Sequence, residues 1–161
     1  KAAVKRQGNT VAILNFGTLL PEALRIAKQF NFTVIDMRFV KPLDTAAITQ
    51  VSSTHDLIVT LEENVIQGGA GSGVSEYLNQ QNISLPTLNL GLPDCFVDHG
   101  KRSELLAQCG LDEKGIKHSI LERLALLDLK PEEADSTSNV EAKADNKANH
   151  YSNKISQSSA I

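Results

Sequence analysis

The sequence predicts an α/β domain in which helices cover both faces of a mostly parallel sheet. Short apolar runs alternate along the chain with stretches whose apolar residues recur every three to four positions. One helix between two successive strands implies a crossover connection, and crossovers place neighbouring strands parallel to one another. The first apolar run also lacks polar alternation, which is typical of a strand buried on both faces.

Composition divides the 161 residues into segments. Residues 10–129 are rich in Val, Ile, Leu and Ala and have the size of one folded domain. Residues 130–161 contain few large apolar side chains and cannot bury enough surface to offset the cost of ordering, so they predict a disordered tail. Residues 1–9 are charged and lack the apolar core of a secretory signal.

The overall composition argues against several classes of function. A net charge of −3, the absence of Trp and the lack of a basic stripe disfavour a nucleic-acid surface. No apolar run approaches the ~20 residues that a membrane helix needs. Cys95 and Cys109 are the only cysteines and form neither a disulfide framework nor a metal-ligand pattern. They predict reduced thiols in a cytoplasmic protein.

The first strand is predicted at residues 11–14 (VAIL), followed by a helix. Thr18 can cap that helix, and Pro21 falls in its first turn, where a missing N–H costs nothing. The buried stripe of the helix is Ala23, Ile26, Ala27 and Phe30. Residues 33–36 (TVID) begin the second strand, which can extend to Val40.

Asp44 is the predicted N-cap of the second helix. The inner positions of that helix are Ala47, Ile48 and Val51. Residues 56–61 (DLIVTL) predict the third strand, which leads through Glu62 and Glu63 into a glycine turn at residues 68–73. One side of the third helix carries Val74, Tyr77 and Leu78.

Residues 85–90 (LPTLNL) predict the fourth strand, at an edge of the sheet because Pro86 cannot donate to a ladder. A short helix then stops at Gly110, and Asp112 can cap the last helix. The short helix carries Leu105 and Leu106, and the inner positions of the last helix are Ile116, Ile120, Leu124 and Leu127. Functional groups of such sheets gather beyond the carboxyl ends of the strands, here the loops at residues 15–18, 38–44, 62–73 and 91–100.

The glycine turn is a candidate phosphate cradle, because exposed backbone amides at a helix start bind anions well. Its spacing argues against that function. No Lys-Ser/Thr pair follows Gly73, and Val74 stands where a dinucleotide fingerprint has its third glycine. A tight strand-to-helix turn with close packing is therefore the favoured interpretation.

The adjacent residues Glu62 and Glu63 are the acidic feature that most suggests a catalytic role. Adjacent residues on an extended chain point to opposite faces, so the two carboxylates cannot converge as a general acid–base pair. We expect one of them to bond to backbone amides of the following turn and the other to face a partner domain.

His99 lies in the loop at residues 91–100, close in sequence to Asp94. Such a residue can carry a proton or form an interface hydrogen bond, although a role in bracing the loop is favoured. His55, His118 and His150 are interpreted as surface residues, and no two histidines have metal-ligand spacing. No independent active site emerges from these residues.

Five strings, taken in series, resemble the C-terminal domain of the 1-deoxyxylulose-5-phosphate synthase family. They are VAILNFGTLLPEAL (11–24), DMRFVKPLD (36–44), VTLEEN (59–64), GGAGSGV (68–74) and GLPDCFVDHG (91–100). The resemblance extends over about residues 11–124. It implies the three-layer α/β/α fold of the transketolase C-terminal domain, with one antiparallel edge strand in a mostly parallel sheet.

The resemblance also implies a role in an enzyme. Synthases of this family condense pyruvate with glyceraldehyde 3-phosphate on thiamine diphosphate and Mg²⁺, with loss of CO₂, at the entry to isoprenoid, thiamine and pyridoxal precursors. They are cytoplasmic homodimers whose cofactor motifs lie in the first two domains. The Gly-Asp-Gly metal motif does not occur here, so the chain alone is expected to hold no cofactor, no metal and no catalytic residue. Residues 1–9 resemble the linker from the preceding domain, and residues 130–161 have no family counterpart.

By this resemblance the domain supports the N-terminal and central domains of its own enzyme and the second subunit of the homodimer. The candidate contact residues at its rim are Glu62, Glu63, Asn64, Gly68, Gly69, Asp94 and His99. Two alternatives remain open. One is a free-standing regulatory module that binds a small ligand or a protein through the loops at 62–73 and 91–100. The other is the C-terminal domain of a 2-oxo acid dehydrogenase β-chain.

Overall fold

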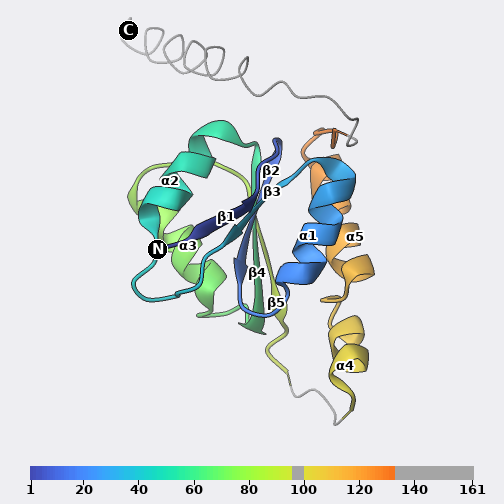
Figure 1. Ribbon diagram of the computed structural model, residues 1–161. Helices are drawn as coiled ribbons and strands as arrows, with labels where there is room; N and C mark the ends of the chain where they lie inside the picture. The colour runs from blue at the N-terminus through green and yellow to red at the C-terminus, as the bar shows by residue number, and fades with distance from the viewer. Residues whose placement is uncertain (96–99, 133–161) are drawn as a thin grey trace, which may run out of the picture.

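Five strands form one sheet in the order β1-β3-β2-β4-β5 in the computed structural model, which describes residues 1–95 and 100–132 (Figure 1). The strands are β1 (Ala3–Arg6), β2 (Val11–Phe16), β3 (Thr33–Asp36), β4 (Leu57–Val65) and β5 (Thr87–Leu92). The β2, β3, β4 and β5 strands pair in parallel, whereas β1 runs antiparallel to β3. The predicted mostly parallel sheet with one antiparallel edge strand is confirmed.

Helices cover both faces of this sheet. In the described residues they are α1 (Leu20–Phe30), α2 (Thr45–Thr54), α3 (Ala70–Gln80), α4 (Arg102–Gln108) and α5 (Glu113–Leu126). Figure 1 shows α1 and α5 on one face and α2 and α3 on the other, with α4 beyond the carboxyl ends of the strands. The result is the three-layer α/β/α architecture.

Each face of the sheet has its own apolar core, because alternate strand residues point to opposite sides. In the central strand β2, Val11 and Ile13 pack with α1 and α5, whereas Ala12 and Leu14 pack with α2 and α3. All six residues of β2 are buried. This double burial explains why the strand reads as a continuous apolar run.

Helix capping largely follows the sequence. The side chain of Asp44 accepts a hydrogen bond from the backbone N–H of Ala47 at 3.2 Å, and that of Asp112 accepts one from Gly115 at 2.8 Å. Pro21 lies in the first turn of α1. The prediction for Thr18 is wrong, because Leu19 is the N-cap of α1 and makes no side-chain capping bond.

Several strand boundaries differ from the predicted ones. Residues 3–6, within the segment expected to be a linker, pair with β3 as the edge strand β1. The β3 strand ends at Asp36 and does not reach Val40, because Arg38 adopts a φ of 63°, which turns the backbone out of the extended conformation. The β4 strand continues past Leu61 to Val65, and β5 occupies the predicted edge. Most of the predicted tail, residues 133–161, lies outside the described residues.

His55 is not a surface residue. Only 6% of it is exposed, and its Nε2 lies 2.7 Å from the hydroxyl of Thr33. This contact lies at the amino ends of the strands, away from the loops that carry the candidate site. Among the described residues, no helix has the length and apolar character needed to cross a membrane.

Candidate functional site at the carboxyl ends of the strands

The carboxyl end of β4 brings its two neighbouring glutamates to opposite faces of the sheet. The side chain of Glu62 points to the face covered by α3, as do those of Ile58 and Thr60. The side chain of Glu63 points to the face of α1 and α4. The predicted divergence of the two side chains is confirmed. Their carboxylates therefore serve two different contacts.

Glu62 caps the helix α3 from the neighbouring strand. Its Oε2 accepts a hydrogen bond from the N–H of Ala70 at 2.8 Å, and its Oε1 accepts one from Gly71 at 2.9 Å. The N-cap residue of this helix, Gly69, has no side chain that could do so. Because Glu62 is only 3% exposed, these two bonds are shielded from water. A negative group at this position also opposes the positive end of the helix dipole.

The glycines of the turn leave room for this carboxylate. A β-carbon on Gly69 would lie 2.5 Å from Oε2 of Glu62, and one on Gly71 would lie 2.4 Å from the hydroxyl of Thr60. A third glycine, Gly91 in β5, would bring a β-carbon to 3.2 Å from Cγ of Glu62. Close packing around Glu62 and Thr60 therefore explains glycine at positions 69, 71 and 91.

The capping of α3 by Glu62 argues against phosphate binding at the glycine turn. The amides at the N-terminus of α3 that would cradle an anion already bind the protein's own carboxylate. A phosphate would have to displace Glu62 and leave a negative side chain buried without partners, at a large cost in free energy. The glycine turn is a packing device.

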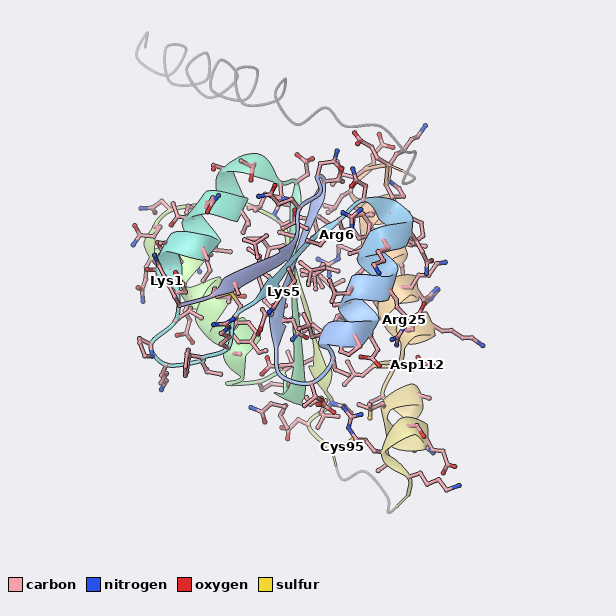
Figure 2. The ribbon with its side chains drawn as sticks, viewed as in Figure 1. Lys1, Lys5, Arg6, Arg25, Cys95 and Asp112 are labelled. Atoms are coloured by element: carbon pink, nitrogen blue, oxygen red, sulfur yellow. The ribbon has the colours of Figure 1, made fainter. Side chains whose placement is uncertain are left out.

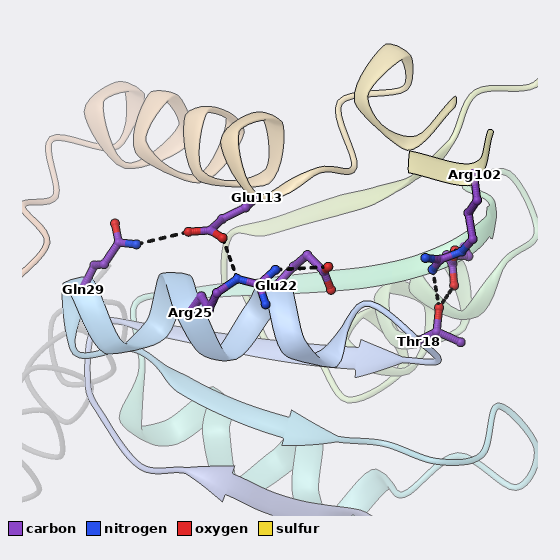
Figure 3. A network of polar contacts seen from close by, with 7 residues as sticks. Thr18, Glu22, Arg25, Gln29, Arg102 and Glu113 are labelled. Carbon is purple, nitrogen blue, oxygen red and sulfur yellow. Dashed lines mark hydrogen bonds and ion pairs between the residues drawn. The ribbon is translucent and has the colours of Figure 1, made fainter. Parts of the chain in front are cut away.

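Glu63 belongs to a polar cluster at the rim, which joins three separate segments (Figure 3). Arg102 at the start of α4 donates to Oε1 of Glu63 from Nε at 3.0 Å and from Nη2 at 2.5 Å. Nη2 of Arg102 also donates to the hydroxyl of Thr18 at 2.6 Å, and that hydroxyl bonds to Oε2 of Glu63. No residue of α4 is buried, and the helix contacts the rest of the domain through this cluster and through the half-buried Leu106, which packs against the core.

A second polar network joins α1 to α5 (Figure 3). Nε of Arg25 donates to Oε2 of Glu113 at 2.6 Å, and Nη2 of Arg25 donates to Glu22 at 3.2 Å. The hydrogen bond to Glu113 is the main cause that raises the pKa of the Arg25 guanidinium above its ordinary value. These contacts lie at the surface, and the bond between Arg25 and Glu113 joins the two helices.

A pocket of about 450 Å³ lies between α1, α4 and α5. Arg25 and Arg102 both line it, but each is bound to a carboxylate of the same chain. Their charges are therefore already neutralised, and the pocket offers no free guanidinium for an anionic ligand.

The remaining predicted rim residues do not converge on one point. Asn64, Gly68 and Asp94 are exposed, and the N–H of Gly68 donates to the hydroxyl of Ser72 within the turn. His99 lies outside the described residues. Within residues 1–95 and 100–132, no three His, Cys, Asp or Glu side chains are placed to hold a metal ion.

Both cysteines in the described part of the chain are free thiols. Cys95 is exposed in the segment that follows β5 (Figure 2). Cys109 is half-buried at the end of α4.

Sequence reasoning missed the roles of Arg102 and Asn15. The contact of Arg102 with Glu63 joins residues far apart in the chain, and no local pattern announces it. Asn15 is fully buried in β2; its Nδ2 donates to the carbonyl of Gly17 at 2.8 Å, and its Oδ1 has no hydrogen-bond partner among the described residues. The signal for the buried hydrogen bond of Asn15 was its place as a polar residue at the end of the apolar run of β2.

Known proteins are similar to this chain in sequence, and a solved structure is similar to it in fold. The family model "Transketolase, C-terminal domain" matches residues 1–116. The 1-deoxy-D-xylulose-5-phosphate synthase of Pseudomonas fluorescens is 56% identical over 129 residues, which are 80% of this chain and 20% of that protein. The synthase of Klebsiella pneumoniae is 57% identical over 125 residues, 78% of this chain and 20% of that protein.

A solved structure of a "split gene transketolase, inactive beta4 tetramer" superposes with a TM-score of 0.70 at 27% identity, covering 78% of this chain and 42% of that one. The chain spans about a fifth of the length of the curated relatives it matches. Its match to the family model covers more than half of its residues. The chain therefore belongs to the transketolase C-terminal domain family.

Proposed function

We propose that this chain is the C-terminal supporting domain of a 1-deoxy-D-xylulose-5-phosphate synthase. The complete enzyme condenses pyruvate with glyceraldehyde 3-phosphate, releases CO₂ and supplies precursors of isoprenoids, thiamine and pyridoxal. The observation that carries the proposal is the identity of 56–57% to two synthases over about four-fifths of the chain. The same observation favours a synthase over a 2-oxo acid dehydrogenase β-chain and over a free-standing module.

The cofactor of the complete enzyme, thiamine diphosphate with Mg²⁺, does not fit the described residues of this chain. The amides at the start of α3 are bound to Glu62, so a diphosphate finds no cradle there. Arg25 and Arg102 are likewise paired with carboxylates. In our proposal the cofactor and the reacting groups therefore belong to the rest of the synthase.

The partners of the domain in this proposal are the N-terminal and central domains of the same polypeptide and the second subunit of a cytoplasmic homodimer. A domain whose acidic rim residues bind its own helices suits a supporting role. Glu62 binds the start of α3 and Glu63 binds Arg102 of α4, so both carboxylates contact residues of the domain itself.

A domain exchange tests this function. The segment of the Pseudomonas fluorescens synthase that matches this chain is replaced by residues 1–132, and formation of 1-deoxyxylulose 5-phosphate is measured. We expect the fused synthase to be active and the same synthase without the segment to be inactive. A folded but inactive fusion would contradict the proposal, as would turnover of both substrates by the isolated chain with thiamine diphosphate and Mg²⁺.

A further inference from the structure

Exposed apolar side chains occur on the antiparallel edge strand β1 and in the loop that follows its partner β3. In the described residues, the large apolar side chains with high exposure are Val4 (52%), Phe39 (55%), Val40 (49%) and Leu126 (77%). Phe39 and Val40 are adjacent in the loop between β3 and α2, and Val4 lies on β1, which pairs with β3. Single exposed apolar residues are ordinary, but neighbouring ones of this size mark contact surfaces.

The loop at residues 37–43, here called the docking loop, is fixed at both ends. Met37 is 1% exposed and its N–H donates to the carbonyl of Asn15 at 2.9 Å. At the other end Leu43 packs against the core beneath α2, and Asp44 binds the N–H of Ala2 at 2.8 Å. Between these anchors Phe39 and Val40 project outward from a held backbone. Little ordering would therefore be needed when a partner binds them.

The surroundings of the docking loop are basic in a chain of net charge −3. Arg38 and Lys5 both approach Asp36, at 3.6 and 3.7 Å, so one carboxylate serves two cations. Lys41 in the loop and Lys1 at the adjacent chain end are exposed (Lys1 and Lys5 are labelled in Figure 2). Phe39 and Val40 thus stand between two cations of the loop, Arg38 and Lys41, which form its basic rim, and they fit an apolar pocket bordered by acidic side chains.

We propose that the docking loop binds the part of the synthase that precedes this domain, through Phe39 and Val40 in an apolar, acid-rimmed pocket. This inference rests on the proposed function. The relatives are about five times as long as the matched segment, so most of their surface for contact lies outside it. A second copy of the chain is disfavoured as the occupant, because two identical basic rims would repel each other.

Hydroxyl-radical footprinting of the isolated chain and of the active fused synthase tests this inference. We expect Phe39 and Val40 to be oxidised readily in the isolated chain and to be protected several-fold in the fusion. Leu126, exposed on α5, is the internal control and should be oxidised equally in both. Equal oxidation of Phe39 in the two proteins would overturn the docking assignment and leave the proposed function intact, provided that the fusion is active.

Substitution tests the same assignment by stability. Phe39→Ser with Val40→Ser should leave the Tm of the isolated chain nearly unchanged and lower that of the fusion, whereas Leu126→Ser should affect neither. A loss of Tm in the isolated chain would assign the two side chains to internal packing. Protection that appears in the isolated chain as its concentration rises would assign the surface to a second copy. Either result would overturn the proposal, and an inactive fusion with protected Phe39 would contradict only the proposed function.

Discussion

The carboxylate of Glu62 and the missing side chain of Gly69 are complementary features of one helix start. A β-carbon at position 69 would lie 2.5 Å from Oε2 and 2.7 Å from Oε1 of Glu62, well inside van der Waals contact. The carboxylate takes the place that an N-cap side chain would occupy and binds the amides of Ala70 and Gly71. This contact joins β4 to α3 and closes the anion site that the turn would otherwise present.

Removal of the Glu62 carboxylate should destabilise the domain. Glu62→Ala leaves two buried amides without an acceptor, and we expect a loss of about 3 kcal/mol in the free energy of unfolding. Urea denaturation followed by circular dichroism measures it. Glu63→Ala is the matched control, because its partner Arg102 is 61% exposed, and it should cost less than about 1 kcal/mol. Equal effects of the two substitutions would contradict the capping role.

The glycines of the turn should differ sharply in their tolerance of a methyl group. Gly71→Ala places a β-carbon 2.4 Å from the hydroxyl of Thr60, and we expect a loss of about 1–3 kcal/mol. Gly73→Ala meets no atom within 4 Å and lies inside α3, so it should stabilise by about 0.5–1 kcal/mol. Thermal unfolding of both variants checks the contrast, which fails if Gly71→Ala is neutral.

Asp44 should contribute a pH-dependent part of the stability. Hydrogen bonds, first from the N–H of Ala2 and then from Ala47, lower the pKa of its carboxyl below the ordinary value of 3.8. A lowered pKa in the folded state stabilises the fold above the ordinary pKa, and this contribution is lost as the pH falls through the folded value. The stability difference between the wild type and Asp44→Asn should therefore shrink as the pH falls from neutral to well below 3.8. A difference that stays constant across this range would contradict the assignment.

The contact of Arg102 with Glu63 and Thr18 should hold α4 against the rim. Arg102→Ala should raise amide hydrogen exchange in residues 102–108 while lowering the overall stability by less than about 1 kcal/mol. Mass-spectrometric exchange resolves this helix from α5. Lys101→Ala, which alters the neighbouring exposed cation, should leave the exchange unchanged. Unaltered protection of α4 in Arg102→Ala would show that another contact holds it.

Much of the fold could be predicted because apolar periodicity dominates its interior. The run at residues 11–14 is buried on both faces, and Asp44 and Asp112 announce the starts of α2 and α5. The strand β1 escaped prediction because it is a half-exposed edge strand with Lys5 and Arg6 in its sequence. A charged edge of this kind carries no apolar pattern.

The candidate site was predictable to the extent that local geometry controls it. The alternation of side chains along a strand sent Glu62 and Glu63 to opposite faces, and the expected bond between one carboxylate and the turn amides is confirmed. The prediction that Thr18 caps α1 was wrong, because its hydroxyl makes a long-range contact with Arg102 instead. The prediction of His55 as a surface residue was wrong, because this residue at the end of α2 is buried beside Thr33 of β3, and no local pattern indicates that long-range contact.

Calorimetric titration of thiamine diphosphate and Mg²⁺ tests the central claim most directly, namely that this domain supports a synthase without hosting its cofactor. The isolated chain should give no heat of binding, and the fused synthase should bind the cofactor in a one-to-one ratio per chain. Stoichiometric binding of thiamine diphosphate by the isolated chain would contradict the claim.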